Sequence, residues 1–247
     1  MAGTGVAGTF PAEGQVMPAW LHDQAYRAEA ARVVAQYRLL VEPLALAFGR
    51  ESEALLHDFS RLPNSIVAIS GRLSGREVGG PCTDLLLQDV LSDAPPRHRV
   101  GYQSTMPNGQ ICRSTSIYLF GSPERPVGSL CINTDVSSLV SARETLDSLI
   151  GGRAHSPEPD DERTNGENFY QTVEQAADGI LKDAIRKTGV SPNMMSRKHK
   201  VLLVGELEDR GFFMLRGAVD LAASTLSVSK YTVYNYLNEI GKEVGRQ

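Results

Sequence analysis

The chain has 247 residues, of which 41% are hydrophobic and 22% are charged, a composition typical of a soluble globular protein. No apolar run approaches the roughly 20 residues that a membrane-spanning helix requires, and the first residues lack the basic and apolar segments of a secretion signal. Three cysteines without paired spacing argue against a disulfide framework. We therefore expect a cytoplasmic protein with no membrane segment, long enough for two domains.

The first half of the chain predicts a tail followed by an α+β domain. Residues 1–20 are rich in glycine and alanine and show little periodicity, so we expect a disordered tail. Apolar residues at helical spacing predict a helix within residues 21–48, which Pro43 can kink or restart. The pattern then predicts a strand at 65–70, a helix at 83–91, and strands at 100–105, 111–120 and 127–135. The last three strands are expected to form an antiparallel sheet, so residues 21–150 form the α+β domain.

The second half of the chain begins with a linker by composition. Residues 151–163 hold two glycines, two prolines and no large apolar side chain, and we extend this linker to residue 166. A helix is predicted at 167–187, with an apolar stripe that could be a dimer seam or a face docked on the next domain. Both interpretations of the stripe stay open. A further helix at 196–209, ended by a glycine, completes the start of an all-α domain over residues 167–247.

Residues 219–238 have the pattern of a helix-turn-helix. Ala222 and Ala223 are small, as needed where two helices cross closely, and Ser229 stands at the N-cap position of the second helix. Ser227 lies in the tight turn, where glycine is favoured because the turn often requires a positive φ. The alternative interpretation is a pair of packed helices in an ordinary helical domain.

The second helix of this motif presents hydrogen-bond donors and aromatic groups away from its apolar face, as a recognition helix must. We expect Lys230 to meet phosphate or guanine and Asn235 to pair with adenine. Tyr231 and Thr232 could contact phosphate or a thymine methyl group. The candidate DNA-binding residues are Ser229, Lys230, Tyr231, Thr232, Tyr234, Asn235 and Asn238.

The distribution of charge favours DNA binding by a dimer. The whole chain carries a net charge of −4, but residues 196–247 hold eight Lys/Arg and six Asp/Glu and are therefore at +2. A single module with this small excess binds phosphates weakly. Useful affinity for operator DNA is thus expected to need two modules side by side, in a homodimer or a higher oligomer.

Two features of the first half are candidates for binding a small-molecule effector. Arg76 lies between glycines in a loop, where it could clamp a ligand carboxylate or pair with an internal acid to fix the loop. Alternate residues of the strand at 111–120 place Cys112, Ser114, Ser116 and Tyr118 on one face. This patch could line a ligand cavity above the sheet or face solvent near a strand end.

The sequence offers little support for an enzyme, a metal site or a bound cofactor. The five histidines are scattered singly, and no nucleophile–base pair can be assembled from known motifs, so we expect no catalytic residues and no metal ligands. Cys82, Cys112 and Cys131 could be redox sensors or metal ligands, but buried small hydrophobes are the favoured interpretation.

Motifs in both halves together resemble the YheO/DauR-type transcriptional regulators, which pair a YheO-like PAS domain with a C-terminal helix-turn-helix. The resemblance spans roughly residues 30–240. The motifs that carry it are residues 56–59, 65–69, 74–84, 101–102 and 108–109 in the first half, and 207–213, 215–218 and 226–234 in the second. It implies a PAS-like antiparallel-sheet sensor, a helical DNA-binding domain, homo-oligomers, and repression in response to small metabolites.

Two functions from different classes follow from these observations. The first is a DNA-binding transcriptional regulator, expected to be a repressor, whose PAS-like domain senses a small metabolite and alters the spacing of two recognition helices. The second is a PAS-containing signalling adaptor in which both domains serve protein contacts. The exposed face of Lys230, Tyr231 and Asn235 distinguishes them, because only the first function needs it for DNA.

Overall fold

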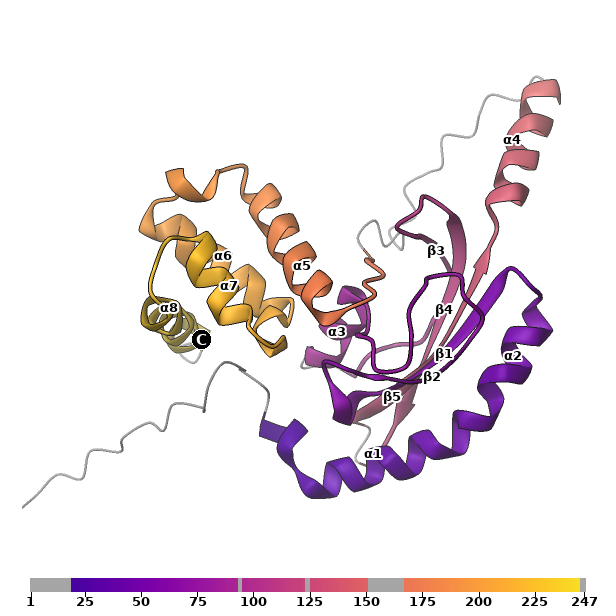
Figure 1. The fold of residues 1–247 in the computed structure, drawn as a ribbon, viewed down its shortest axis with the longest axis horizontal. Helices are drawn as coiled ribbons and strands as arrows, with labels where there is room; N and C mark the ends of the chain where they lie inside the picture. Colours follow the sequence, from indigo (N-terminus) through magenta and orange to yellow (C-terminus); the bar gives the residue numbers. More distant parts are fainter. Residues whose placement is uncertain (1–18, 93–94, 123–124, 151–166, 245–247) are drawn as a thin grey trace, which may run out of the picture.

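The computed structural model describes residues 19–92, 95–122, 125–150 and 167–244. An antiparallel sheet with its covering helices forms an N-terminal sheet region, and four α-helices form a C-terminal helical region (Figure 1). The α+β class expected from the sequence is therefore confirmed. The predicted linker at 151–166, and the predicted tail apart from residues 19 and 20, lie outside the described residues.

The sheet has five strands in the order β2-β1-β5-β4-β3, and every neighbouring pair is antiparallel. The four predicted strands are confirmed to within one residue at either end. The strands are β1 (Ser52–Asp58), β2 (Ile66–Ser70), β3 (Arg99–Thr105), β4 (Ile111–Phe120) and β5 (Pro126–Asp135).

Strand β1 is the element of the sheet that sequence patterning missed. Its seven residues, Ser-Glu-Ala-Leu-Leu-His-Asp, include no β-branched side chain, so their β-propensity is low. All seven are buried, because β1 lies between β2 and β5 with both faces covered. A strand covered on both sides has no alternation of polar and apolar residues to read.

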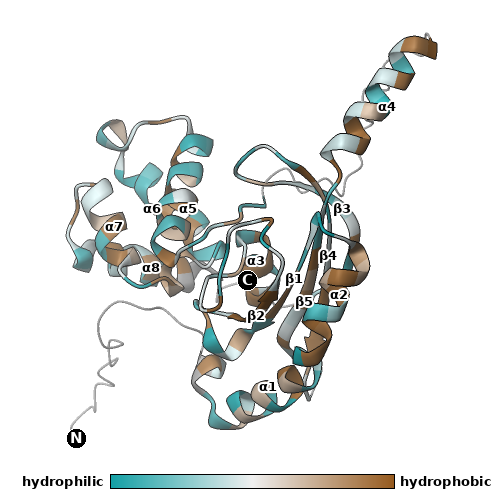
Figure 2. Ribbon diagram, turned by 45° about the vertical axis from the view of Figure 1, so that its right-hand side comes forward, coloured by the Kyte–Doolittle hydropathy of each residue, from teal (hydrophilic) through white to brown (hydrophobic). Residues whose placement is uncertain are grey.

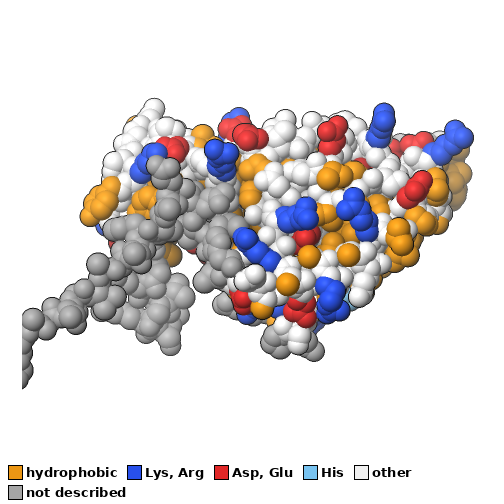
Figure 3. Space-filling model, turned by 60° about the horizontal axis from the view of Figure 1, so that its bottom comes forward, with side chains coloured by type: hydrophobic (Ala, Val, Ile, Leu, Met, Phe, Trp, Pro, Cys, Tyr) orange, Lys and Arg blue, Asp and Glu red, His pale blue; other side chains and the backbone are white. Residues whose placement is uncertain are grey.

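Two helices joined by one 3-10 turn cover the apolar face of the sheet. Helices α1 (Gln24–Tyr37) and α2 (Val41–Phe48) follow the short helix η1 (Ala19–His22), and Asp23 caps α1 by accepting from the Ala25 amide at 2.9 Å. The turn η2 (Arg38–Leu40) interrupts them just before Pro43, so the chain restarts a helix there as expected. The outer side of α2 leaves apolar side chains exposed, which gather toward the right-hand end of Figure 3.

The opposite face of the sheet is polar, although it is buried. Cross-strand partners point to the same side of a sheet, and the register pairs Glu53 with Asn133, His57 with Ser129, and Ser116 with Cys131. We call this surface the polar face. Its polar and cysteine side chains are Glu53, His57, Tyr102, Ser104, Cys112, Ser114, Ser116, Tyr118, Ser129, Cys131 and Asn133.

Helix α3 and the loop before it cover the polar face. The predicted helix at 83–91 is confirmed as α3 (Asp84–Leu91), with Thr83 at its N-cap accepting from the Leu86 amide at 3.3 Å. The 3-10 turn η3 (Phe59–Arg61) lies in the connection between β1 and β2. After β5 the chain forms helix α4 (Ser137–Ile150), which the sequence pattern did not predict. None of the side chains of α4 is buried, and the helix projects away from the sheet (Figures 1 and 2).

The helical region packs four helices around its own hydrophobic core. The predicted helix at 196–209 is confirmed as α6, and Gly211, with φ of 68°, ends it as expected. The elements are α5 (Val173–Thr188), η4 (Pro192–Met194), α6 (Arg197–Asp209), η5 (Phe212–Met214), α7 (Ala218–Thr225) and α8 (Lys230–Val244).

Helix α5 begins six residues later than the sequence predicted. Thr172 caps it by accepting from the Gln175 amide, and residues 167–172 are not helical. Val173, Ala176, Ile180 and Ala184 are buried in the core of the helical region. The stripe is therefore a face docked within the same chain and not a dimer seam, because its side chains already have partners.

The two regions are in direct contact through α3. A Cβ atom added to Gly211 would lie 2.5 Å from a Leu91 methyl carbon and 2.8 Å from Leu87, so glycine is required for this close approach. Met214 of η5 joins the hydrophobic core of the sheet region. The start of the helical domain is thus held against the helix that covers the polar face.

Candidate functional site

The turn between α7 and α8 has the backbone geometry that the sequence pattern predicted. Ser227 has a positive φ of 51°, the only such value at a non-glycine residue of the described chain. The Val228 amide donates to the Ala223 carbonyl at 3.0 Å, and the Ser227 amide donates to Ser224 at 3.2 Å. These bonds close the end of α7 and set the direction of α8.

Ser229 caps α8 as predicted. Its Oγ accepts from the Thr232 amide at 3.1 Å and lies 2.9 Å from the Thr232 Oγ1. The two hydroxyl groups therefore bind each other and the helix end, which orders the N-terminus of α8. This end carries unsatisfied amide groups and a positive dipole, which favour a phosphate.

The remaining predicted DNA-binding residues form one exposed surface on α8. Lys230, Tyr231, Asn235 and Asn238 are exposed, and the Tyr231 ring is exposed to 66%. Thr232 and Tyr234 are half-buried, with Tyr234 packed in part against the helical core. The structure thus brings all the predicted residues together on one helix, while the two half-buried ones also contribute to packing.

Three contacts around α8 were not evident from the sequence. Lys230 Nζ lies 2.5 Å from Asp220 Oδ1 of α7, with both side chains about three-fifths exposed. Lys200 Nζ donates to the Leu226 carbonyl in the turn at 2.7 Å. Arg197 pairs with Glu239 at 2.6 Å and stacks over the buried Tyr236 ring, 5.7 Å from its centroid. Each contact joins separate helices, so no local pattern reveals it.

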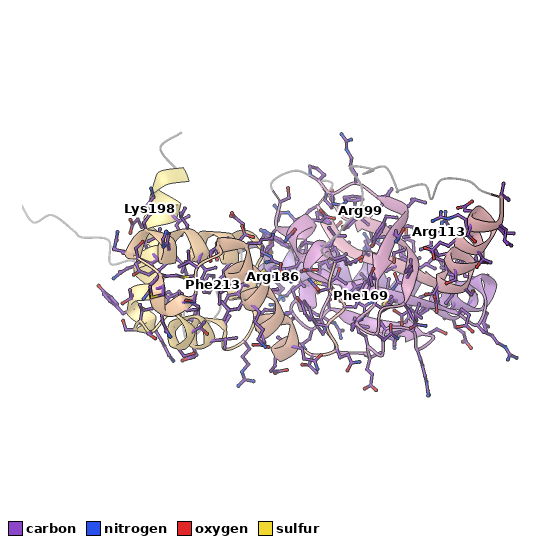
Figure 4. The ribbon with its side chains drawn as sticks, turned by 90° about the horizontal axis from the view of Figure 1, so that it is seen from above. Arg99, Arg113, Phe169, Arg186, Lys198 and Phe213 are labelled. Carbon is purple, nitrogen blue, oxygen red and sulfur yellow. The ribbon has the colours of Figure 1, made fainter. Side chains whose placement is uncertain are left out.

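The polar face contains a buried ion pair at Arg76. Its Nη2 lies 3.5 Å from Glu53 Oε1, with the two side chains at most 1% exposed. Glu53 also accepts from the Ser74 amide and hydroxyl, both at 2.9 Å, and from Asn133 Nδ2 at 3.1 Å. The guanidinium lies over the Phe169 ring, 5.1 Å from its centroid. Phe169 lies on the side of the sheet region that faces the helical region (Figure 4). Pairing with an internal acid, one of the two predicted roles of Arg76, is therefore present.

Glu167, which directly follows the predicted linker in the sequence, lies in the same interior. Its Oε1 accepts from Thr83 Oγ1 at 3.0 Å and from the Tyr102 hydroxyl at 3.3 Å. Burial raises the pKa of this carboxyl to about 7, against the opposing effects of Thr83 and Arg76. Glu167 is consequently close to its titration point at neutral pH.

Three buried polar atoms in this interior lack a hydrogen-bond partner among the described residues. They are His57 Nε2, Arg76 Nη1 and Glu167 Oε2, and we call them the three open atoms. His57 is fully buried, and its other ring nitrogen lies 2.9 Å from Ser65 Oγ. Burial, reinforced by Arg76, lowers the pKa of His57 to about 3, so its ring is neutral.

The four candidate residues of β4 all lie on the polar face. Ser114 Oγ is 2.6 Å from Ser104 Oγ, and Ser116 Oγ is 3.1 Å from the Tyr102 hydroxyl. Cys112 packs with Met106 and Phe169 in a small apolar cluster. Tyr118 instead donates to Asp89, which also holds Arg99, so its hydroxyl belongs to a separate group at the sheet edge. The alternative of a solvent face is wrong, because all four side chains are buried.

Several residues of this interior were not predicted from the sequence. Ser129, Cys131 and Asn133 alternate along β5 as the candidates do along β4, and this signal could have identified them. Glu53 lies in the strand that was not predicted, and Glu167 was placed in a helix. The three cysteines are free and buried, as favoured from the sequence.

The described residues contain neither a metal-binding cluster nor a membrane-spanning helix. No group of three or more His, Cys, Asp or Glu side chains there is arranged to hold a metal ion. No described helix is both long and apolar enough to cross a membrane.

An antiparallel sheet domain of this kind, joined to a helix-turn-helix, defines a DNA-binding transcriptional regulator. Residues 28–151 match the model of the YheO-like PAS domain, and residues 176–238 match that of a helix-turn-helix (HTH) domain. The chain belongs to the YheO-like family of transcriptional regulators, which is not a family of enzymes.

Several relatives are similar to nearly the whole chain. The transcriptional regulator DauR of Pseudomonas aeruginosa is 30% identical over 210 residues, which are 85% of this chain and 94% of the relative. The protein YheO of Escherichia coli is 26% identical over 210 residues, 84% of each chain. A protein of Haemophilus influenzae is 24% identical over 216 residues, covering 87% of this chain and 94% of its own.

The burial of Glu167 predicts a specific dependence of stability on pH. The folded state raises its pKa from 4.5 to about 7, so its stabilising contribution is full below pH 4.5 and is lost as the pH rises through about 7. Relative to Glu167→Gln, the wild type should lose on the order of 3 kcal/mol of unfolding free energy between about pH 4.5 and about pH 8. Denaturant unfolding of both proteins at the two pH values measures this.

The comparison cancels other titrating groups, including Glu208, whose pKa burial also raises. The groups that face Glu167 are Arg76, Thr83, Tyr102 and Asp84, and all are retained in the variant. A free-energy difference between the two proteins that is the same at both pH values would contradict the burial of a carboxyl that titrates near neutrality.

Proposed function

We propose that this protein is a repressor that binds operator DNA as a dimer and releases it when a small metabolite binds on the polar face. We further propose that residues 21–150 act as the sensor domain, that residues 167–247 act as the DNA-binding domain, and that both work in the cytoplasm. The observation that carries the sensing function is the presence of the three open atoms in a buried polar interior. A buried polar atom left unsatisfied costs about 1–3 kcal/mol, so a ligand that satisfies it gains affinity.

The polar face has the chemistry to recognise a small anionic or hydrogen-bonding ligand. Arg76 Nη1 is a charged donor, and a carboxylate is the partner that a guanidinium binds most specifically. Glu167 Oε2 is an acceptor, and Ser114 and Ser116 add hydroxyl groups on the same face. The candidate ligand-binding residues are Arg76, Cys112, Ser114 and Ser116, with Tyr118 nearer the sheet edge. We add Glu167 and His57 to this proposal because each has a buried polar atom without a partner among the described residues.

The exposed surface of α8 has the chemistry to read a major groove. Ser229 and Thr232 order the N-terminus of the helix, where Lys230 and Tyr231 are positioned for backbone phosphates. Asn235 and Asn238 follow on the exposed side, and an asparagine can pair with adenine through two hydrogen bonds. The ion pair of Lys230 with Asp220 must open or share its lysine when phosphate arrives. Because one module carries so little excess charge, two modules in a dimer are required.

Replacing Lys230 by alanine should weaken DNA binding and reduce its dependence on salt. Loss of one phosphate contact lowers the slope of log affinity against log salt by about 1. The measurement is a titration of purified protein against fragments of the DNA that flanks its own gene, across a series of salt concentrations. Lys182→Ala is the matched control, because Lys182 is an exposed lysine of α5 that likewise pairs with an aspartate.

If Lys230→Ala has the same DNA affinity and the same salt slope as Lys182→Ala, α8 is not part of the DNA interface. Failure of the wild-type protein to retain any flanking fragment above background at low salt would contradict the proposed operator.

Replacing Arg76 by lysine should abolish stabilisation by the effector. Lysine keeps the positive charge near Glu53 but lacks the Nη1 donor and the planar stack on Phe169. Thermal unfolding is measured with a panel of small carboxylate-bearing metabolites. A compound at 100 times its Kd stabilises the wild type by about 2.7 kcal/mol, a shift in Tm of roughly 5–11 °C for a protein of this size.

Arg99→Lys is the control for this experiment, because Arg99 pairs with Asp89 at the sheet edge and should leave the shift intact. A metabolite that shifts Arg76→Lys as much as the wild type binds elsewhere, and the assignment of the polar face would then be wrong.

A further inference from the structure

Residues 167–169 connect the polar face to the helical region, and we call them the strap. Phe169, the last residue of the strap, lies three residues before Thr172, the N-cap of α5. The strap therefore lies just before the first helix of the helical region. Glu167 is held by Thr83 and Tyr102, and the Phe169 ring lies against Arg76. The strap therefore supplies one of the three open atoms, Glu167 Oε2, and lies against the residue that carries another, Arg76.

Asn168, the middle residue of the strap, is hydrogen-bonded to Asp84, the first residue of α3. The Asn168 amide donates to Asp84 Oδ1 at 2.8 Å, and Asn168 Nδ2 donates to Asp84 Oδ2 at 2.7 Å. Asp84 is 3% exposed. Thr83, which caps α3, bonds to Glu167 at the same time. Movement of the strap consequently disturbs both residues at the start of α3.

Arg210 joins this point to the helical region. Its Nη2 lies 3.6 Å from Asp84 Oδ2 and 3.1 Å from Asp183 Oδ2 of α5. Its Nη1 donates to the Ile180 carbonyl at 3.4 Å, and the side chain is buried. Arg210 is the residue after α6, which packs directly on α8. One guanidinium thus links the sheet region to α5 and to the end of α6.

We propose that the strap is the element that transmits occupancy of the polar face to the DNA-binding helices, through Asn168, Asp84 and Arg210. The inference rests on the proposed function, because it assigns a route by which that function is regulated. Arg76 Nη1 has no hydrogen-bond partner among the described residues, while its guanidinium lies over the Phe169 ring and acts electrostatically on Glu167. An occupant that bonds to this atom therefore binds next to the strap and displaces it. When the strap is displaced, Asp84 loses two hydrogen bonds and the position of Arg210 changes with it.

Displacement of the strap removes hydrogen-bond donors from the buried carboxyl of Asp84. Asp84 and Asp183 share one buried guanidinium, and burial raises the pKa of Asp84 against the effect of Asn168 and Arg210. A carboxylate in such a place depends on every donor that it has. Loss of Asn168 must therefore be compensated by a shift of Arg210, and α6 moves with it.

Asn168→Asp is the variant that tests this route, because it places a like charge against Asp84 with almost no change in size. We expect faster hydrogen exchange at residues 167–172 and in α6. DNA affinity should change by roughly 5–150-fold, the range of typical allosteric coupling. Asn193→Asp is the matched control, since Asn193 is exposed in η4 and the same charge is added there. It should change neither the exchange nor the affinity.

Each outcome decides between the alternatives. Faster exchange in the strap with DNA affinity equal to that of Asn193→Asp would show a structural tie only and would overturn the inference. Unchanged exchange in the strap would also overturn it, because Asn168 would then not hold the strap. If the wild type binds no DNA, the proposed function fails by itself. The inference is then judged by whether exchange in α6 responds to Asn168→Asp.

Discussion

Burial of three ionisable side chains in one interior is the constraint on which this molecule depends. Arg76 and Glu53 are almost completely removed from water, and Glu167 approaches them from another part of the chain. Removing one partner of such a pair costs about 3–5 kcal/mol, because the other charge is left uncompensated. Ser74, Asn133, Thr83 and Tyr102 must therefore all stay in place, which fixes the loop, the sheet and the strap relative to one another.

The two faces of the sheet differ in their chemistry, and in the proposed function only the polar face binds the ligand. One face is apolar and is covered by α1 and α2, so its side chains form the hydrophobic core. The polar face keeps hydroxyl, amide and charged groups dry at a cost in stability. That cost is understandable where the groups receive a ligand. Arg210 connects this side of the sheet region to the helical region through Asp84 and Asp183, and this is the route that we propose for the effect of a ligand on α8.

Local patterns predicted most of the elements, and they also predicted the residues that lie on the exposed surface of α8. The helix-turn-helix could be predicted because its turn, its cap at Ser229 and its exposed face are all encoded within 20 consecutive residues. The interior of the sheet region was predicted only at Arg76 and where one strand alternates, as in β4. Glu53 was missed because β1 has no pattern to read, and Glu167 because tertiary contacts to Thr83 and Tyr102 override a helical pattern. Pairs such as Asp84–Arg210 depend on the complete fold.

The central claim is that the polar face and the DNA-binding helix are coupled, and coupling of binding free energies is reciprocal. The most direct measurement is hydrogen exchange over the whole chain, compared between the free protein and its complex with a flanking DNA fragment. If the polar face and α8 are coupled, DNA changes exchange at residues 71–83 and 167–172 as well as in α7 and α8. Changes confined to α7 and α8 would contradict it, because the sheet region would then be independent of the DNA-bound state.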